Sequence, residues 1–330
     1  MEQPGRTILR TEGLRVWFPV KGGWLHRTTG QLKAVDGVDI ELLAGETLAL
    51  VGESGCGKST LGKSLIRLLE PTAGKLLLHG SEDVTHLSGR ALLPLRREVQ
   101  MIFQDPFSSL NPRMMVGESV AEGMALRYPE WSRSQREARV AELLGQVGLN
   151  PADATRYPHQ FSGGQRQRIG LARALAVEPR LIVCDECTSA LDVSVQAQIL
   201  NLLKTIQSAT GVAYLFITHD LSVVGYLADR VAVMYLGHIV EEGCAEEIFA
   251  RPAHPYTQAL FAAAPKVGAD GTRSAGASAM LSGDVPSPIH PPSGCPFHPR
   301  CPKATPQCAA EFPEWRSVGE RHRVRCPGNL

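Results

Sequence analysis

The segment GESGCGKST, residues 52–60, has the residue types and spacing of a phosphate-binding loop. It fits the Walker A pattern G-x-x-x-x-G-K-[ST]. Glycines let backbone N–H groups wrap a phosphate, and the N-terminus of a following helix adds a favourable dipole. We expect Lys58 to reach the β- and γ-phosphates, Ser59 to ligate Mg²⁺ and Thr60 to lie near the α-phosphate. The residues predicted to bind nucleotide in this loop are Gly52, Ser54, Gly55, Cys56, Gly57, Lys58, Ser59 and Thr60.

Cys56 lies inside this loop, next to Lys58 and the expected start of the helix. A nearby cation and a helix N-terminus both favour a thiolate. One interpretation is therefore a reactive thiol that bound nucleotide protects from alkylation. The other is a small, unreactive side chain that fills space.

Two adjacent acids end the apolar segment LIVCDE, residues 181–186. Asp185 is expected to hold Mg²⁺ through water, as a Walker B aspartate does, and Glu186 to polarise the attacking water. The segment CDEC (184–187) also matches C-x-x-C, which can indicate zinc or redox chemistry. We reject that interpretation because Cys184 lies inside the apolar strand and both acids are needed at the nucleotide.

A second anion site is predicted in FSGGQ, residues 161–165. A serine hydroxyl and exposed glycine amides at a helix N-terminus bind anions. A protein with one phosphate loop already has such a site for its own nucleotide. The second site, formed by Ser162, Gly163, Gly164 and Gln165, therefore implies a nucleotide held by a partner subunit.

Alternating strands and helices must position these residues. Strands are predicted at 46–52, 181–186 and 212–220, and a hairpin at 230–243 turns at Gly237. Helical patterns occupy the stretches between them, at 135–149, 166–177 and 194–207. Strands alternating with helices predict an α/β fold with a largely parallel core sheet.

Composition excludes several classes of protein. The 330 residues are 43% hydrophobic and 20% charged, with a net charge of +1. This near-neutral balance gives no electrostatic footprint for nucleic acid. No apolar run approaches the length of a membrane span, and no apolar stretch follows the charges of the first ten residues. We therefore expect an intracellular protein.

The motifs taken together resemble those of ATP-binding cassette (ABC) ATPases, with FSGGQ as their signature motif. IFQDP resembles the Q-loop, which implies that Gln104 contacts Mg²⁺ and water and couples to the membrane domains. SALD resembles the D-loop and places Asp192 at a dimer seam, while ITHD makes His219 the γ-phosphate contact. LRVWFPV resembles the A-loop, where an aromatic ring stacks on adenine; Phe18 is preferred and Trp17 is the alternative.

The resemblance implies a P-loop cassette with a RecA-like core, an antiparallel β subdomain and a helical subdomain. The cassette is predicted at 1–264, with its helical subdomain at about 105–175. The expected catalytic residues are Glu186, His219, Gln104 and Lys58, and the expected Mg²⁺ ligands are Ser59, Gln104 and Asp185. Two departures from the family pattern are Cys187, where proline usually follows the Walker B glutamate, and Phe161, where leucine is commoner.

Longer segments resemble the ATPase subunits of dipeptide and oligopeptide importers. They are ESGCGKSTL, FQDPFSSLNPR, RYPHQFSGGQRQRI and HPYTQALFAAAPK. The resemblance implies a second ATPase subunit, usually a different one, two transmembrane permease subunits and an extracytoplasmic peptide-binding protein. It places the chain at the cytoplasmic face of the membrane. Nickel or glutathione import would suit the chain equally, and a soluble ABC ATPase acting on nucleic acid or ribosomes is the rival class.

The tail, residues 265–330, differs from the rest in composition. It begins with a Gly/Ala/Ser linker and holds 11 prolines and four cysteines in 66 residues. So small a segment, rich in proline, is expected to need a staple. The resemblance implies a [4Fe–4S] cluster on Cys295, Cys301, Cys308 and Cys326, with His298 a bystander. Structural zinc, cysteines without metal, and a redox or iron sensor remain the alternatives, and we expect the tail to be independent of the ATP chemistry.

Overall fold

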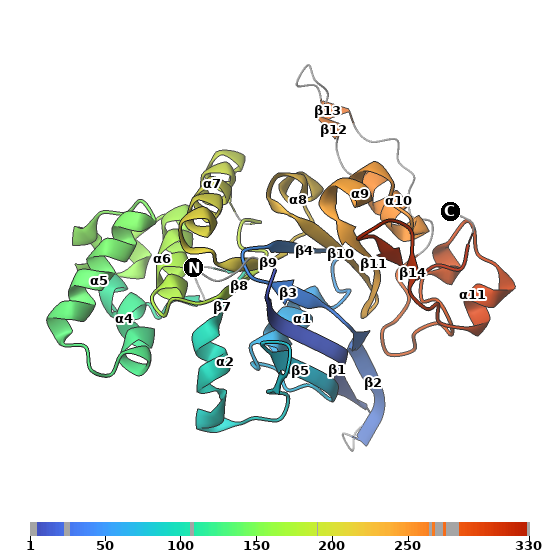
Figure 1. Cartoon of the computed structure of the whole chain (residues 1–330), viewed down its shortest axis with the longest axis horizontal. Coiled ribbons are helices and arrows are strands. Elements are labelled where there is room, and N and C mark those ends of the chain that lie inside the picture. Colours follow the sequence, from blue (N-terminus) through green and yellow to red (C-terminus); the bar gives the residue numbers. More distant parts are fainter. Residues whose placement is uncertain are drawn as a thin grey trace.

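The computed structural model describes residues 5–22, 27–105, 109–189, 191–263, 266–267, 273–274 and 284–328. Two large sheets and a group of helices make up the molecule (Figure 1). The helices α4–α6 lie at one end of the view, and the last elements of the chain lie at the other end.

The larger sheet has eight strands in the order β14-β15-β11-β10-β4-β9-β8-β7. Five neighbouring strands of this sheet run parallel to one another: β10, β4, β9, β8 and β7. Their bounds are β4 Thr47–Val51, β7 Val99–Ile102, β8 Leu181–Asp185, β9 Ala213–Ile217 and β10 Arg230–Tyr235. Every residue of β4, β8 and β9 is buried, as expected for apolar strands covered on both faces. The predicted parallel core is confirmed.

Strand β11, His238–Cys244, returns antiparallel to β10 and forms the predicted hairpin at Gly237. The second sheet is antiparallel, with the order β2-β1-β5-β6 and β3 paired to β1. Its strands are β1 Thr7–Gly22, β2 Arg27–Val38, β3 Glu41–Leu43, β5 Ala73–Leu78 and β6 Glu82–Asp83. Side chains from both sheets, among them Leu9 and Leu48, share one hydrophobic core with helix α1, Lys58–Leu65.

Three helices, α4 Val116–Arg127, α5 Arg133–Gln146 and α6 Gly163–Leu175, form a separate group. The apolar faces of these helices meet in a second core that includes Val120, Leu143 and Ile169. Serine side chains accept from backbone N–H groups at the N-termini of α5 and α6. The group lies where a helical subdomain is predicted from the sequence.

The remaining helices are α2 Leu93–Glu98, α7 Val193–Thr210, α8 Leu221–Leu227, α9 Ala245–Ala250 and α10 Pro255–Ala263. Short 3-10 turns are η1 Gly89–Leu92, η2 Pro151–Thr155 and η3 Pro158–Gln160. Strands β12 Lys266–Val267 and β13 Arg273–Ser274 pair with each other, and most of the predicted linker lies outside the described residues. None of the described helices is both long and apolar enough to cross a membrane.

The tail packs on the cassette. Its elements are η4 His298–Arg300, α11 Pro306–Ala310, β14 Arg316–Ser317 and β15 Arg323–Val324. Strand β15 pairs with β11 and so extends the core sheet. Phe297 is 1% exposed and packs in one cluster with Tyr235 and Tyr256. The tail therefore buries apolar side chains such as Phe297 against the core of the cassette, which its composition alone did not predict.

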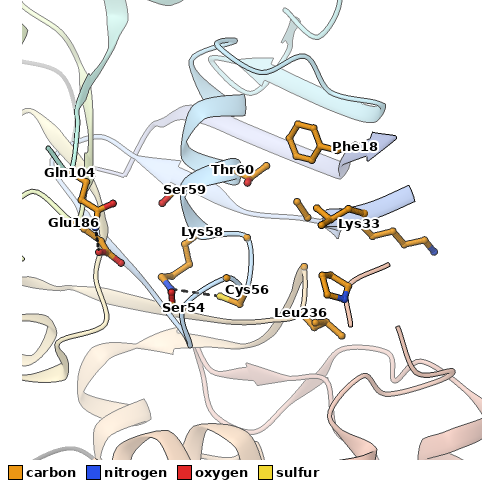
Figure 2. A pocket seen from close by; sticks show the side chains of 16 residues that line it. Phe18, Lys33, Ser54, Cys56, Lys58, Ser59, Thr60, Gln104, Glu186 and Leu236 are labelled. Atoms are coloured by element: carbon orange, nitrogen blue, oxygen red, sulfur yellow. Dashed lines mark hydrogen bonds between the residues drawn. The ribbon is translucent and has the colours of Figure 1, made fainter. Parts of the chain in front are cut away.

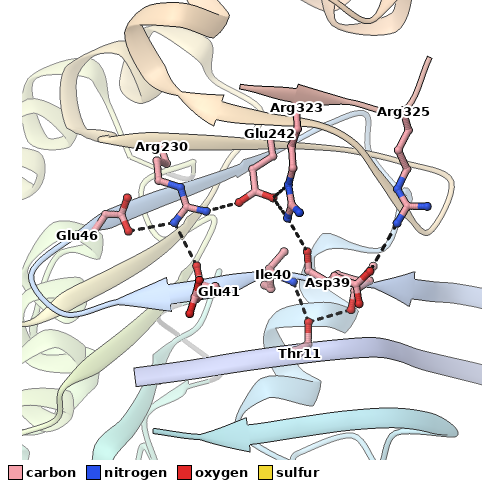
Figure 3. A network of polar contacts seen from close by, with 10 residues as sticks. Thr11, Asp39, Ile40, Glu41, Glu46, Arg230, Glu242, Arg323 and Arg325 are labelled. Atoms are coloured by element: carbon pink, nitrogen blue, oxygen red, sulfur yellow. Dashed lines mark hydrogen bonds and ion pairs between the residues drawn. The ribbon is translucent and has the colours of Figure 1, made fainter. Parts of the chain in front are cut away.

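Charged side chains also join the tail to both sheets (Figure 3). The carboxylate of Glu242 on β11 is 3% exposed and accepts from Arg230 on β10 and from Arg323 on β15. Arg325 lies 3.6 Å from Asp39, which follows β2. Because the buried Glu242 carboxylate contacts an arginine from each neighbouring strand, the network helps to fix β15 on the sheet.

Candidate functional site

Four parallel strands deliver the predicted catalytic residues to one edge of the larger sheet. Strand β4 leads into the phosphate loop, and β8 ends at Asp185, with Glu186 next. Strand β9 is followed by His219, and β7 is followed by Gln104. The carboxyl ends of parallel strands are the usual place for a ligand in an open α/β sheet.

The phosphate loop depends on glycine at both ends. Gly52 has φ 153° and Gly57 has φ 110°. An added Cβ would lie 2.2 Å from the Met234 carbonyl oxygen at position 52 and 2.0 Å from the Ala34 carbonyl oxygen at position 57, so neither site has room for a side chain. The buried ammonium of Lys58 donates to the carbonyl oxygens of Gly52 at 2.8 Å and Glu53 at 2.9 Å. Lys58 is therefore held across the loop by backbone groups.

Two of the three predicted Mg²⁺ ligands, Ser59 and Asp185, are in direct contact. The Ser59 hydroxyl donates to Asp185 Oδ1 at 2.7 Å. Burial raises the pKa of Asp185, and the hydrogen bond from Ser59 and the charge of Lys63 oppose that rise. A hydroxyl and a carboxylate are hard oxygen ligands, which suit Mg²⁺. The donor chemistry therefore fits the ion.

Two other predicted residues contact Glu186, and Figure 2 shows one of them, Gln104. Gln104 Nε2 donates to Glu186 Oε2 at 2.8 Å, and His219 Nδ1 lies 3.4 Å from Glu186 Oε1. The backbone of Glu186 has φ 46°, a left-handed conformation that is unfavourable for a residue with a side chain. Three segments far apart in the sequence thus aim one carboxylate.

The pocket at this edge has a volume of about 290 Å³. It is lined by Phe18, Leu32, Lys33, Ala34, residues 54–60, Gln104, Glu186, Leu236, Gly237 and Pro288. Figure 2 shows Phe18 on the side of the pocket away from Glu186 and Gln104. Trp17 is not among these lining residues. The ammonium of Lys33 lies over the Trp17 ring, 4.9 Å from its centroid.

The signature residues lie elsewhere. Ser162 caps helix α6 by accepting from the N–H of Gln165, and its own N–H donates to Gln165 Oε1 at 3.0 Å. Of the residues that the structure describes, none from 162–165 lines the pocket. Asp192 caps helix α7 and accepts from the N–H of Val195 at 2.9 Å. The signature and D-loop residues are therefore not placed at this chain's own nucleotide pocket.

The surroundings of Cys56 oppose the thiolate considered above. The residue is 5% exposed, and burial raises the pKa of its thiol in spite of the opposing charge of Lys58. The sequence shows the neighbouring cation but not the burial, which has the larger effect. Burial therefore favours the space-filling interpretation, and the response of Cys56 to alkylating reagents stays a prediction.

The two cysteines of the C-x-x-C segment lie in the protein interior. Cys184 and Cys187 are both buried free thiols, and hydrogen bonding between them and burial raise the pKa of Cys184. Cys187, in the usual place of proline, packs in the apolar cluster of the helical part. A proline at position 187 would favour an extended backbone at Glu186, the residue before it. Cys187 does not impose that restriction on Glu186.

Several residues at the site carry no motif that assigns them there. Tyr256 accepts from the N–H of Glu53 at 2.8 Å, and Arg300 pairs with the Glu53 carboxylate. Pro288 lines the pocket from the tail. Tyr256 belongs to the segment HPYTQALFAAAPK, which resembles the importer subunits. That resemblance was the one indication in the sequence that Tyr256 could matter at the site.

The four tail cysteines line one cavity of about 120 Å³, together with His254, His298 and other residues. Burial raises the pKa of the Cys295 thiol to about 11. His298 Nδ1 lies 2.9 Å from the carbonyl oxygen of Cys295. Within the described ranges, no group of three or more His, Cys, Asp and Glu side chains could hold a metal ion. The structure therefore gathers the four thiols in one cavity but shows no group suited to a single metal ion among the described residues.

Comparison with known proteins decides the family. The ABC transporter family model matches residues 35–189, and the model described as "Oligopeptide/dipeptide transporter, C-terminal region" matches 240–308. The oligopeptide transport ATP-binding protein AppF of Bacillus subtilis is 48% identical over 97% of this chain and 97% of its own length. This chain belongs to the ABC transporter ATP-binding proteins.

Two further relatives extend the likeness. The probable peptide ABC transporter ATP-binding protein y4tS of Sinorhizobium fredii is 50% identical over 97% of this chain and 89% of its own length. A dimeric, post-hydrolysis structure of the ATP-binding cassette MJ0796 with ADP and Pi has a TM-score of 0.63 and 28% identity, over 72% of this chain and 98% of that one. The predicted ABC cassette fold is confirmed, and ATP hydrolysis is the general activity of this family.

Proposed function

We propose that this ABC protein is the ATP-hydrolysing subunit of a peptide importer. The observation that carries the proposal is the identity of 48–50% over 97% of the chain to ATP-binding proteins named for peptide or oligopeptide transport. The match of residues 240–308 to the oligopeptide/dipeptide transporter C-terminal region adds a second segment outside the common cassette.

In the proposed mechanism the chain's own residues bind and orient the nucleotide. Phe18 stacks on the adenine, and loop 52–60 surrounds the phosphates, with Lys58 balancing the charge of the γ-phosphate. Ser59 and Asp185, with Gln104, would hold Mg²⁺, which neutralises phosphate charge when bound. Glu186 accepts a proton from the attacking water, and His219 contacts the γ-phosphate. Their contacts with one another keep these groups aimed at one point.

The proposed active state contains two cassettes. The signature residues 162–165 are not at this chain's own pocket, and the related MJ0796 structure is a dimer. Each nucleotide would lie between the phosphate loop of one cassette and the signature motif of the other. We propose a different ATPase subunit as the partner, two transmembrane permease subunits and an extracytoplasmic peptide-binding protein, with this chain at the cytoplasmic face. The chain divides, in this proposal, into the cassette 1–264 and the tail 265–330.

The rival class is a soluble ABC ATPase that acts on nucleic acid or ribosomes. Lys58 and Ser162 are 104 residues apart with no heptad pattern between them, which leaves no room for a long coiled coil. The net charge of +1 offers no basic footprint for nucleic acid. Peptide import is therefore favoured, and nickel and glutathione are the competing cargoes.

Growth on peptides tests the proposal. Cells that lack this chain and need one amino acid should fail to grow when it is supplied as a di- or oligopeptide, and should grow on the free amino acid. The wild-type chain should restore growth, and Glu186→Gln, which cannot hydrolyse ATP, should not. If cells without the chain take up peptides normally but lose nickel or glutathione uptake, the cargo is nickel or glutathione and not peptide.

We also propose that Cys295, Cys301, Cys308 and Cys326 hold a [4Fe–4S] cluster. The support is that all four thiols line one cavity and that thiolates are the usual ligands of such clusters. Structural zinc stays the alternative, because thiolates are also usual ligands of Zn²⁺. The proposed role is to fasten the tail, as metals do in small domains.

Anaerobic purification separates these alternatives. The proposal predicts brown protein with about four irons and four sulfides per chain. Cys301→Ser should lose the iron and make the tail more sensitive to proteolysis, whereas Cys244→Ser, which alters a cysteine outside the cavity, should keep both. Colourless protein with one zinc per chain would support structural zinc, and protein without metal would refute both.

A further inference from the structure

A tail residue reaches the phosphate loop directly. Arg300 ends the turn η4, next to Cys301, and its side chain is 5% exposed. Its guanidinium donates from Nη1 to Glu53 Oε2 at 2.9 Å and from Nη2 to Glu53 Oε1 at 3.1 Å. Nη1 also lies 3.3 Å from the Tyr235 hydroxyl. This two-pronged contact joins residues 247 positions apart.

Glu53 is the residue through which several parts of the chain hold the loop. Its carbonyl oxygen accepts from Lys58 Nζ at 2.9 Å and from the N–H of Cys56 at 3.3 Å. Its N–H donates to Tyr256 on α10. Its carboxylate accepts from Nη1 and Nη2 of Arg300. A shift of Glu53 would therefore move the carbonyl group that positions the Lys58 ammonium.

Charge gives Arg300 a second effect. Glu53 follows the first glycine of the phosphate loop, and its side chain is only 24% exposed. An unbalanced carboxylate there would repel the triphosphate, because screening by water is weak at a partly buried site. A bidentate guanidinium balances that charge and fixes the orientation of the carboxylate.

We propose that Arg300 is a positioning residue for ATP binding: through Glu53 it sets the phosphate loop and cancels a repulsive charge beside the phosphates. The tail is thus part of the nucleotide site. This inference rests on the proposed nucleotide site and goes beyond it, because it assigns the tail a direct role in ATP affinity.

A second tail contact supports the same conclusion. The carbonyl oxygen of Pro288 accepts from the N–H of Lys33 on β2 at 3.2 Å, and Pro288 lines the nucleotide pocket. The neighbouring Ile289 packs on Gly30, where an added Cβ would lie 3.0 Å from Ile289 Cγ2. The tail therefore contacts both the phosphate loop and the strand that carries Lys33.

The test is the affinity for ATP of Arg300→Ala in the full chain, measured by titration with a fluorescent nucleotide. We expect the Kd to rise about tenfold, which corresponds to about 1.4 kcal/mol. In the assembled transporter, KM for ATP should rise by a similar factor, and kcat should change little because Glu186, Gln104 and His219 are untouched. Arg316→Ala, which removes an exposed arginine of the same tail, should bind ATP as wild type does.

A second substitution separates positioning from a general loss of structure. In Arg300→Ala/Glu53→Gln, the repulsive charge is gone, so most of the lost affinity should return. If Arg300→Ala does not fold, Arg300→Gln, which keeps a donor and removes the charge, should fold and still weaken ATP binding. Wild-type affinity in both Arg300 variants would overturn the inference, as would a failure of Glu53→Gln to restore binding. Absence of ATP binding by the wild-type chain would instead refute the nucleotide site itself.

Discussion

Replacing Glu186 with Gln should abolish ATP turnover and leave ATP binding intact. The Glu186 carboxylate is the proposed acceptor of the proton from the attacking water, and an amide cannot take that proton. General-base assistance is worth roughly 10²–10⁴-fold in rate. We therefore expect the ATPase rate of the assembled transporter to fall by about that factor.

The structure explains why binding should survive this change. The variant has nearly the same shape, and its amide oxygen can still accept from Gln104 Nε2, which lies 2.8 Å from the Glu186 carboxylate. None of the phosphate-loop contacts of Lys58 involves Glu186. ATP should accumulate unhydrolysed and hold two cassettes together.

Steady-state phosphate release and nucleotide titration measure the two effects separately. Glu320→Gln, the same chemical change at an exposed position of the tail, serves as the control and should behave as wild type. A Glu186→Gln protein whose turnover is within a few-fold of wild type would show that another group activates the water.

Much of the nucleotide site could be predicted because its residues are contiguous in the sequence. The loop 52–60 and the acids 185–186 need a strand before them, and the apolar runs that precede them are short and unambiguous. The strands β4 and β8 accordingly begin and end within one residue of their predicted bounds, and β9 begins within one residue but ends three residues earlier than predicted.

What the sequence did not reveal depends on contacts between distant segments. The sequence separation of Arg300 and Glu53 does not indicate that they pair. The pair forms because Phe297 packs beside Tyr235 and Tyr256 and so brings this part of the tail to the phosphate loop. The state of Cys56 was missed for a related reason, since the adjacent Lys58 is visible in the sequence and the burial of the thiol is not. Composition alone likewise gave the tail no partner, although the tail extends the core sheet.

Gly163→Asp should stop hydrolysis in the assembled transporter while the isolated chain still binds ATP. Gly163 is the first residue of α6, and in the proposed dimer its amide faces the γ-phosphate held by the other cassette. A carboxylate there would repel that phosphate. Losing one preorganised contact of this kind costs roughly 10²–10³-fold in rate.

Position 163 is chosen because the substitution can be accommodated. A Cβ on Gly163 would meet only Leu191 Cδ2 at 3.7 Å, an ordinary contact, whereas a Cβ on Gly164 would lie 2.5 Å from Val195 Cγ1. An aspartate in the first turn also favours the helix dipole. Gly163→Ala adds the same Cβ without the charge and should lose much less activity.

The central claim is that each nucleotide is completed by the signature motif of a second cassette. Its most direct test is to compare, for Gly163→Asp, the ATP affinity of the isolated chain with the ATPase rate of the transporter. The account predicts wild-type affinity in the isolated chain and a fall of at least about 100-fold in the rate. A wild-type rate in the transporter, or loss of ATP binding by the isolated, folded chain, would contradict it.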